Sequence, residues 1–330
     1  MSRVLITGGA GFIGSHLCDA YLGRGSNVIV LDDLSSGNER NLAAALQTGR
    51  CELVVGDVRD EIVVQSLVER CDLVFHMAAR IGLMLVVQSA LRTLAANVDG
   101  TSVVLRQAAK YHRKILVAST SEVYGLSREF PSREDGAIVI GSPEKNRWSY
   151  ACSKAVDEFA ALAYHREEGL PAIAVRLFNT VGPRQSARYG MVIPRFVRQA
   201  LSGEPLTVYG DGTQTRCFCY VGEVVAALTK LIEHPGALGK IVNIGNPEEV
   251  RIIDLANRVI AATNSRSTIK FVSFEEAYEA NFEEIMRRMP DITRARDLIG
   301  FSPRFDLDAI LSEIIADHRE TSAQGASAPR

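Results

Sequence analysis

The chain has 330 residues, of which 47% are hydrophobic and 23% charged, as is ordinary for a globular protein with one large or two unequal domains. A net charge of only −2 argues against nucleic-acid or membrane partners held by a general electrostatic field, and no apolar run approaches the roughly 20 residues of a membrane span. The six scattered cysteines form no zinc or redox motif, so we expect reduced thiols, no metal site and a cytoplasmic location.

Short apolar runs rich in β-branched residues alternate with helical stretches through the first half of the chain. They lie at residues 3–8, 27–33, 52–58, 72–79, 114–120 and 171–179. This alternation predicts βαβ units, and continuous apolar strands predict a parallel sheet that is buried on both faces. We therefore expect an α/β fold, a Rossmann-type doubly wound parallel sheet with ligands at the carboxyl ends of its strands.

A glycine-rich turn joins the first predicted strand to a helix. Gly9, Gly11 and Gly14 have the G-x-G-x-x-G spacing in the strand–turn–helix context that a dinucleotide site requires. Such a turn brings the backbone close to a pyrophosphate, at a helix N-terminus that favours anions. The sequence thus predicts a dinucleotide site, and we expect five residues of this turn to contact the cofactor: Gly8, Gly11, Phe12, Ile13 and Gly14.

Acidic residues end the next two strands. Asp32 lies where a carboxylate binds the adenosine ribose and repels a 2′-phosphate, which favours NAD over NADP. Arg40, farther along that loop, is expected to be a solvated charge. Asp57 and Val58 end the third strand and are expected beside the adenine, and Ala78 follows the fourth strand on the same wall.

A pair of polar residues marks a candidate proton-transfer site. Tyr150 and Lys154 are separated by one helical turn, so both side chains leave the same helix face. A phenol becomes a base near neutral pH only if its pKa is lowered, which an adjacent ammonium and a bound nicotinamide cation would do. Thr120 ends the strand at 114–120, and Ser121 and Glu122 follow it at the edge where substrate is expected. Glu122 has an alternative interpretation as a local turn residue.

Beyond residue 179 the alternation weakens, which predicts a second, smaller unit. We expect an NAD-binding domain at 1–179 with 216–245 returning to it. We expect a smaller α/β C-terminal substrate lobe at 180–215 and 246–318, and a disordered tail at 319–330.

Taken together, these motifs resemble the extended short-chain dehydrogenase/reductases, in the branch of nucleotide-sugar epimerases, dehydratases and decarboxylases. The resemblance covers nearly the whole chain and includes TGGAGFIGSHL at 7–17, HMAA at 76–79, YACSK at 150–154, RLFNTVGPR at 176–184, LTVYGDGTQTR at 206–216 and RMPD at 288–291. Within the branch, STSEVYG at 119–125 and EKNRWSYACSK at 144–154 are similar to UDP-glucuronate decarboxylases, which include the UDP-xylose synthases.

The resemblance implies a role for each matching residue. Thr120 would bond the sugar, Tyr150 would be the base and Lys154 would bind the nicotinamide ribose. The remaining matches would bind substrate: Asn179 the diphosphosugar, Tyr209 the nucleotide base or ribose, and Arg216 and Arg288 the pyrophosphate. Ser121 and Glu122, with Arg216, would support decarboxylation. The loop at 80–87 lacks the Pro-rich sequence of typical xylose synthases, which leaves the exact sugar and the role of Arg80 open.

The branch shares oxidation at sugar C4 to a 4-keto intermediate, with NAD as cofactor. We expect decarboxylation of UDP-glucuronate to UDP-xylose or a UDP-4-keto-pentose, with 4-epimerisation of UDP-glucose or UDP-glucuronate as the alternative. A 4,6-dehydratase typically needs Asp-Glu where Ser121 and Glu122 stand, and a non-catalytic NAD-sensing protein would not need Tyr150. Family members often pair through two long helices. We therefore expect a homodimer in which Val103, Val104, Ala108 and Ala109 contribute, unless these residues pack on the sheet.

Overall fold

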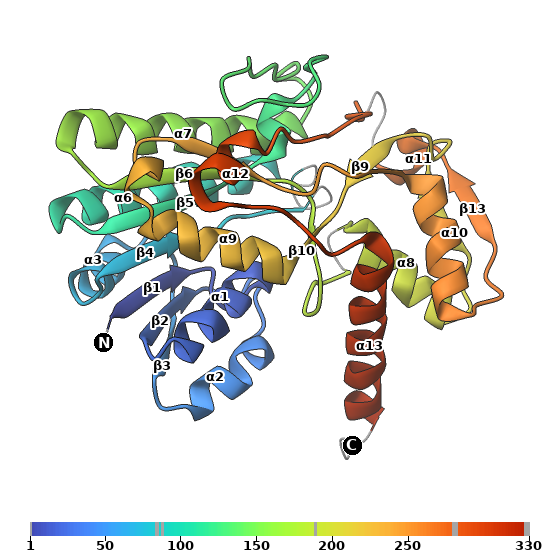
Figure 1. Ribbon diagram of the computed structural model, residues 1–330, viewed down its shortest axis with the longest axis horizontal. Helices are drawn as coiled ribbons and strands as arrows, with labels where there is room; N and C mark the ends of the chain where they lie inside the picture. The colour runs from blue at the N-terminus through green and yellow to red at the C-terminus, as the bar shows by residue number, and fades with distance from the viewer. Residues whose placement is uncertain (1, 83–85, 87–88, 188–189, 279–282, 327–330) are drawn as a thin grey trace.

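The computed structural model describes residues 2–82, 86, 89–187, 190–278 and 283–326. Its centre is a seven-stranded parallel sheet in the order β11-β6-β5-β4-β1-β2-β3 (Figure 1). The strands are β1 (Arg3–Thr7), β2 (Asn27–Asp32), β3 (Cys51–Val55), β4 (Leu73–His76), β5 (Lys114–Thr120), β6 (Ala172–Leu177) and β11 (Ile241–Ile244). All six apolar runs of the first half form strands, and the Rossmann-type fold expected from them is confirmed. From β1 the chain first adds strands on one side and then, from β4 on, on the other side. Ligands bind at this switch point between β1 and β4 in such folds.

Helices cover both faces of the sheet, as its apolar strands require. One face packs against α1 (Phe12–Gly23), η1 (Glu39–Leu42), α2 (Ala43–Gln47), α9 (Val221–Glu233) and α12 (Thr293–Ile299). The other face packs against α3 (Glu61–Glu69), α6 (Gly100–Lys110) and α7 (Trp148–Glu168). These two layers bury the β-branched residues of β1, β2, β4, β5 and β6 almost completely, whereas Val55 on the edge strand β3 is 62% exposed.

The helix before β5 is continuous but uneven. It consists of α5 (Ala90–Leu94), a π-helical turn η2 (Ala95–Asp99) and α6. Val104 and Ala108 are fully buried against the sheet, and Val103 and Ala109 are each 8% exposed. The expectation that these four residues form a dimer contact is therefore wrong, because they belong to the core of the chain itself.

The second half of the chain builds a smaller lobe beside the sheet (Figure 1). Its helices α8 (Val192–Leu201), α10 (Ile252–Thr263) and α13 (Leu307–Ala326) share one apolar core with β8 (Leu206–Tyr209). The other elements of the second half are β7 (Thr180–Val181), β9 (Thr215–Cys217), β10 (Cys219–Tyr220), η4 (Pro235–Ala237), β12 (Glu249–Arg251), β13 (Ile269–Val272) and α11 (Phe274–Ala277). β11 and α9 lie on the central sheet, as we expected for the returning segment, while the domain boundaries themselves stay a prediction.

The chain end differs from expectation. α13 runs through Ala326, so residues 319–326 are helical rather than a disordered tail, and 327–330 lie outside the described residues. The helix is anchored by Ile310, Leu311 and Ile314 in the core of the smaller lobe. Extending an established helix costs little, because each added residue gains one backbone hydrogen bond.

Two acidic residues join the lobes through Arg184. The Arg184 guanidinium pairs with Asp19 on α1 at 2.8 Å, and its backbone N–H donates to Asp317 on α13 at 3.2 Å. Arg184 has φ of +66°, a conformation that costs energy for a residue with a Cβ. The contact therefore fastens the last helix to the helix that follows the glycine-rich turn.

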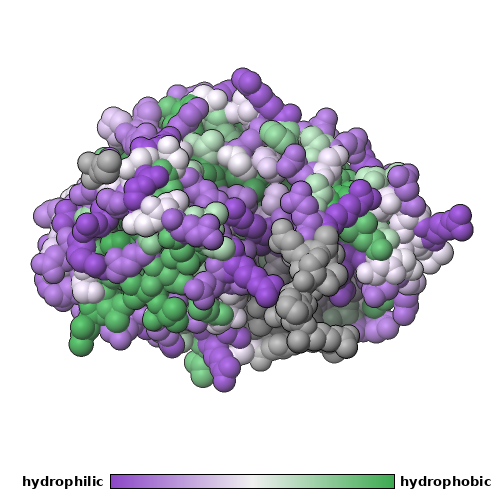
Figure 2. Space-filling view, turned by 90° about the horizontal axis from the view of Figure 1, so that it is seen from below, coloured by the Kyte–Doolittle hydropathy of each residue, from purple (hydrophilic) through white to green (hydrophobic). Residues whose placement is uncertain are grey.

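The face of the molecule seen in Figure 2 is mainly hydrophilic. Seen from below, its largest hydrophobic area lies on the half that contains the seven-stranded sheet (Figure 2). Within the described residues, no helix combines the length and apolar character needed to cross a membrane.

Candidate active site

A cavity of about 1740 Å³ runs along the carboxyl ends of the strands and reaches into the smaller lobe. Every residue that the sequence singled out for cofactor, catalysis or substrate contributes to its wall. These are Gly8, Gly11, Phe12, Ile13, Gly14, Asp32, Asp57, Val58, Ala78, Thr120, Ser121, Glu122, Tyr150, Lys154, Asn179, Tyr209, Arg216 and Arg288. The fold thus brings the predicted residues together, while their roles stay predictions.

Close backbone packing explains the glycines of the turn. Gly8 has φ of +69°, and a Cβ there would lie 2.7 Å from the backbone nitrogen of Ala78. A Cβ on Gly14 would lie 2.3 Å from the carbonyl oxygen of Gly8. Gly11 caps α1 in an extended conformation without a side-chain cap. The turn therefore leaves N–H groups at a helix N-terminus facing the cavity, an arrangement that suits a pyrophosphate.

Asp32 is held in place by the same turn. Its buried carboxylate accepts hydrogen bonds from the backbone N–H groups of Ala10 and Leu34, each at 2.9 Å. Burial raises the pKa of this carboxyl, and the backbone donors partly oppose the rise. Asp57 forms an ion pair with Arg59, which lowers the pKa of Asp57. Both carboxylates thus lie where an adenosine would extend from the turn.

The predicted base and its neighbours lie at the end of β5. Tyr150 is 5% exposed and hydrogen-bonds Thr120. Burial raises the pKa of Tyr150 and the charge of Glu122 adds to the rise, whereas the bond to Thr120 lowers it. Lys154 bonds Asp157 at 2.7 Å. The protein alone therefore does not give Tyr150 the lowered pKa that we expect of a base, because the effect of burial dominates.

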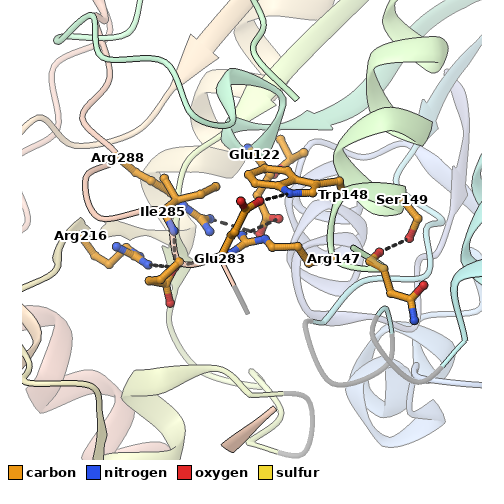
Figure 3. Close-up of polar contacts among 11 residues, drawn as sticks. Glu122, Arg147, Trp148, Ser149, Arg216, Glu283, Ile285 and Arg288 are labelled. Atoms are coloured by element: carbon orange, nitrogen blue, oxygen red, sulfur yellow. Dashed lines mark hydrogen bonds and ion pairs between the residues drawn. The ribbon is translucent and has the colours of Figure 1, made fainter. Parts of the chain in front are cut away.

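Five charged side chains form a cluster near Tyr150: Glu122, Arg147, Arg216, Glu284 and Arg288. Figure 3 labels four of them, Glu122, Arg147, Arg216 and Arg288. Glu122, from η3 (Ser121–Tyr124), accepts a hydrogen bond from Arg288 at 3.2 Å and lies 3.7 Å from the Arg147 guanidinium. Burial favours the neutral acid, but the neighbouring arginines outweigh it and lower the pKa of Glu122. Glu122 is therefore an ionised carboxylate at neutral pH.

The other half of the cluster centres on Glu284. Its carboxylate accepts a hydrogen bond from Arg216 at 2.8 Å and lies 3.8 Å from Arg147. The arginine bonded directly to Glu122 is thus Arg288, whereas we had expected Arg216 to work with Glu122. With three guanidinium groups against the carboxylates of Glu122 and Glu284, the cluster carries excess positive charge for an anionic ligand.

The smaller lobe adds an aromatic wall. Arg195 stacks over the ring of Tyr209 with its Cζ 4.1 Å from the ring centroid, and the ring of Tyr278 lies 5.3 Å from that of Tyr209. Asn179 donates to the carbonyl oxygen of Cys217 at 3.2 Å. Stacked aromatic and guanidinium planes are the surfaces on which nucleobases pack.

Sequence reasoning missed three of these residues. Arg147 lies in a segment that we matched to decarboxylases, but the match alone gave it no role, and only its 1% exposed side chain shows it to be a buried cation. Glu284 lies four residues before Arg288 in the sequence and has no motif of its own. No sequence signal singled out Arg195, and only its contact with the Tyr209 ring indicates a role. The signal available for Arg147 was its position one turn before Tyr150.

Comparison with known proteins places this site in a family. The model of the NAD dependent epimerase/dehydratase family matches residues 4–245, which include the glycine-rich turn, Glu122, Tyr150 and Lys154. The chain belongs to this family. The NAD dependent epimerase/dehydratase family is defined by its cofactor, so the dinucleotide interpretation of the turn agrees with the family match.

Relatives in the family act on nucleotide sugars. The UDP-N-acetyl-alpha-D-glucosaminuronate decarboxylase of Bacillus cytotoxicus is 40% identical over 96% of this chain and 98% of its own length. UDP-glucuronic acid decarboxylase 1 of Arabidopsis thaliana is 35% identical over 96% of this chain and 70% of its own length. The structure of UDP-glucuronic acid 4-epimerase from Bacillus cereus, in complex with UDP-glucuronic acid and NAD, has a TM-score of 0.86 and 26% identity over 97% of this chain and 99% of that chain.

Proposed function

We propose that this protein is an NAD-dependent decarboxylase of a UDP-linked hexuronate, with UDP-glucuronate as its expected substrate. The observation that carries the proposal is the position of the Glu122 carboxylate, which accepts a hydrogen bond from Arg288 and lies 3.7 Å from Arg147, near Thr120 and Tyr150. Relatives that are 35% and 40% identical over 96% of the chain and are named hexuronate decarboxylases support it.

The residues present fit NAD. The Gly8 and Gly14 backbone would face the pyrophosphate, Asp32 would accept bonds from the adenosine ribose, and Lys154 would reach the nicotinamide ribose once it exchanges Asp157 for that partner. When bound, NAD supplies the acceptor for the C4 hydride and returns it later. The buried carboxylate of Asp32 favours NAD over NADP, because a 2′-phosphate would bring a second anion to it.

The side chains of the site then divide the work. Thr120 hydrogen-bonds the C4 hydroxyl and Tyr150 accepts its proton, for which its pKa must fall when the nicotinamide cation is near. Oxidation at C4 makes the C5 carboxylate part of a β-keto acid. The bond from C5 to the carboxyl carbon breaks, CO₂ leaves, and the electron pair remains on an enolate. Arg288 bonds Glu122 near Tyr150, so we assign it to this step instead of the pyrophosphate role that the resemblance implies. The positive charges of Arg288 and Arg147 stabilise that enolate, and Arg216 with Tyr209 hold the diphosphate and the nucleoside. A proton from solvent then adds at C5, and C4 regains its hydride together with the proton held by Tyr150.

Product analysis tests the proposal. Purified protein is incubated with NAD and, separately, UDP-glucuronate, UDP-N-acetylglucosaminuronate and UDP-glucose, and products are read by mass and proton NMR. Loss of the mass of CO₂ from a uronate supports decarboxylation, and the relative kcat/KM of the two uronates identifies the sugar. A product of unchanged mass with inverted C4 would make the protein a 4-epimerase and refute the proposal. Tyr150→Phe is the control, and it should bind NAD without turning over substrate. A non-catalytic NAD-sensing protein would keep its function after this substitution.

We also propose a cytoplasmic homodimer. Three large apolar side chains on the neighbouring helices α5 and α7 are exposed, with Leu91 at 79%, Val156 at 43% and Phe159 at 66%. These replace the four core residues that we had expected at the contact. An exposed apolar surface on two adjacent helices suits pairing with a second copy of the chain.

A further inference from the structure

Helix α7 carries a buried carboxylate, Asp157, to which the proposed reaction assigns no chemical role. Asp157 lies one turn beyond Lys154 and accepts a hydrogen bond from its ammonium at 2.7 Å. The two side chains are 1% and 2% exposed. Burying both charges costs desolvation energy that a surface pair would avoid. The pair therefore calls for an explanation beyond helix stability.

A directional chain of hydrogen bonds fixes Asp157 from the opposite side. The hydroxyl of Thr101 on α6 bonds the Asp157 carboxylate, and His76 Nε2 lies 3.0 Å from that hydroxyl. His76 Nδ1 lies 2.8 Å from the hydroxyl of Thr7. Because a carboxylate only accepts, Thr101 donates to it and receives from His76 Nε2–H, which leaves Nδ1 to accept from Thr7. Asp157 is thus held by the strands that carry the cofactor wall.

The charges around this chain are few. Burial lowers the pKa of His76 to about 3, so its ring is neutral. Glu158, the next residue on α7, pairs with Arg176 on β6 at 2.8 Å. The positive charge of Lys154 therefore meets the negative charge of Asp157, and the remaining charged neighbours that act on Tyr150 are Glu122 and Arg288.

We infer that Asp157 is a positioning residue that fixes the Lys154 ammonium, offsets its charge, and so sets the pH at which Tyr150 accepts a proton. The role of Tyr150 as the base rests on the proposed function. Without Asp157, the ammonium would act on the phenolate undiminished. With Asp157, part of that charge is offset, so Tyr150 stays protonated to a higher pH both before and after the ammonium turns toward the nicotinamide ribose.

The titration of Tyr150 tests this directly and needs no sugar substrate. In protein labelled with ¹³C at the tyrosine Cζ, the Tyr150 resonance is identified by its loss in Tyr150→Phe, and its pH midpoint is measured in the NAD complex. Asp157→Asn keeps the size, replaces one acceptor oxygen by a donating NH₂ group and removes the charge, and it should lower the midpoint by about one pH unit. The acid limb of kcat should move in the same direction. An unchanged Tyr150 midpoint in a folded Asp157→Asn protein would overturn the inference.

Matched variants separate charge from structure. Glu158→Gln removes the adjacent buried carboxylate, which serves Arg176 rather than Lys154, and should leave the Tyr150 midpoint where it is. Asp157→Glu keeps the negative charge, so its Tyr150 midpoint should lie closer to that of the parent than the midpoint of Asp157→Asn does. Asp157→Ser is a second neutral variant. If neither neutral variant folds, Asp157 is only a structural counter-ion and the inference falls. The NMR measurement uses no sugar. If the substrate proved to be another sugar, the proposed function would be refuted but the inference about Asp157 would not.

Discussion

Glu122→Gln examines the ion-pair cluster, because the amide has the shape of the carboxylate without its charge. In the structure Glu122 accepts one hydrogen bond from Arg288 at 3.2 Å and lies 3.7 Å from Arg147. A hydrogen bond to a charged group contributes about 1.5–3 kcal/mol, and the amide keeps one acceptor atom. We therefore expect the free energy of unfolding at neutral pH to fall by about 1–2 kcal/mol.

The pH dependence of that difference gives a sharper test. Burial favours the neutral form of Glu122, but the arginines hold its pKa in the folded state below the ordinary value. A carboxyl of this kind stabilises the fold above its unfolded pKa of about 4.3, and the contribution is lost as the pH falls through the folded pKa. The stability difference between the parent and Glu122→Gln should stay constant near neutral pH and shrink below about pH 4.3.

Urea unfolding followed by circular dichroism at a series of pH values measures both quantities. Glu129→Gln is the control, since Glu129 is an exposed carboxylate on the loop that follows η3. It should change the unfolding free energy by less than about 0.5 kcal/mol. If Glu122→Gln proved as stable as the parent at neutral pH, the cost of burying the carboxylate would equal its attraction to Arg288 and Arg147. The reasoning about this cluster would then be refuted.

Four further predictions follow from other parts of the structure. Tyr150→Phe should lower kcat by about 10²–10⁴-fold with NAD affinity nearly unchanged, and a kcat within tenfold of the parent would exclude Tyr150 as the base. Gly14→Ala should abolish NAD binding in calorimetry, because its Cβ would lie 2.3 Å from the Gly8 oxygen. His76 has a folded pKa of about 3, below the unfolded value near 6.5, so stability should fall by up to about 1.4 kcal/mol per pH unit below pH 6.5. His76→Gln, compared by urea unfolding across this range, should lose that slope, and retention of the full slope would contradict the assignment. Phe159→Glu should give a monomer in sedimentation equilibrium, whereas a dimer of unchanged affinity would place the contact elsewhere.

The sheet was predictable because its signals are local. The residues of each apolar run can be buried on both faces only in a parallel sheet, and the turn around Gly11 requires glycines whatever ligand it binds. Topology explains why predicted residues at the ends of different strands line one cavity. Parallel strands place their carboxyl ends at one edge of the sheet, so residues such as Thr120 and Asp32 meet there by topology.

Pairings between distant segments were beyond the sequence. Glu122 and Arg288 are 166 residues apart, and nothing in the chain showed that Arg288 rather than Arg216 would bond Glu122. The burial of Arg147 depends on how the segment before Arg288 packs against α7, which no periodicity reports. The pairing of Lys154 with Asp157 was within reach, since both lie on one helix face, but their depth in the protein was not.

The contact of Arg184 with Asp317 sets an order for the assembly of the molecule during synthesis. The two residues are 133 positions apart, and α13 follows the other described elements of the smaller lobe in chain order, so it leaves the ribosome after them. The strands that form the cofactor edge are complete once β11 has emerged, well before Asp317 exists to bond the Arg184 backbone. The ion pair between Arg184 and Asp19 can thus form first, and α13 is joined to the Arg184 backbone only after Asp317 has been synthesised.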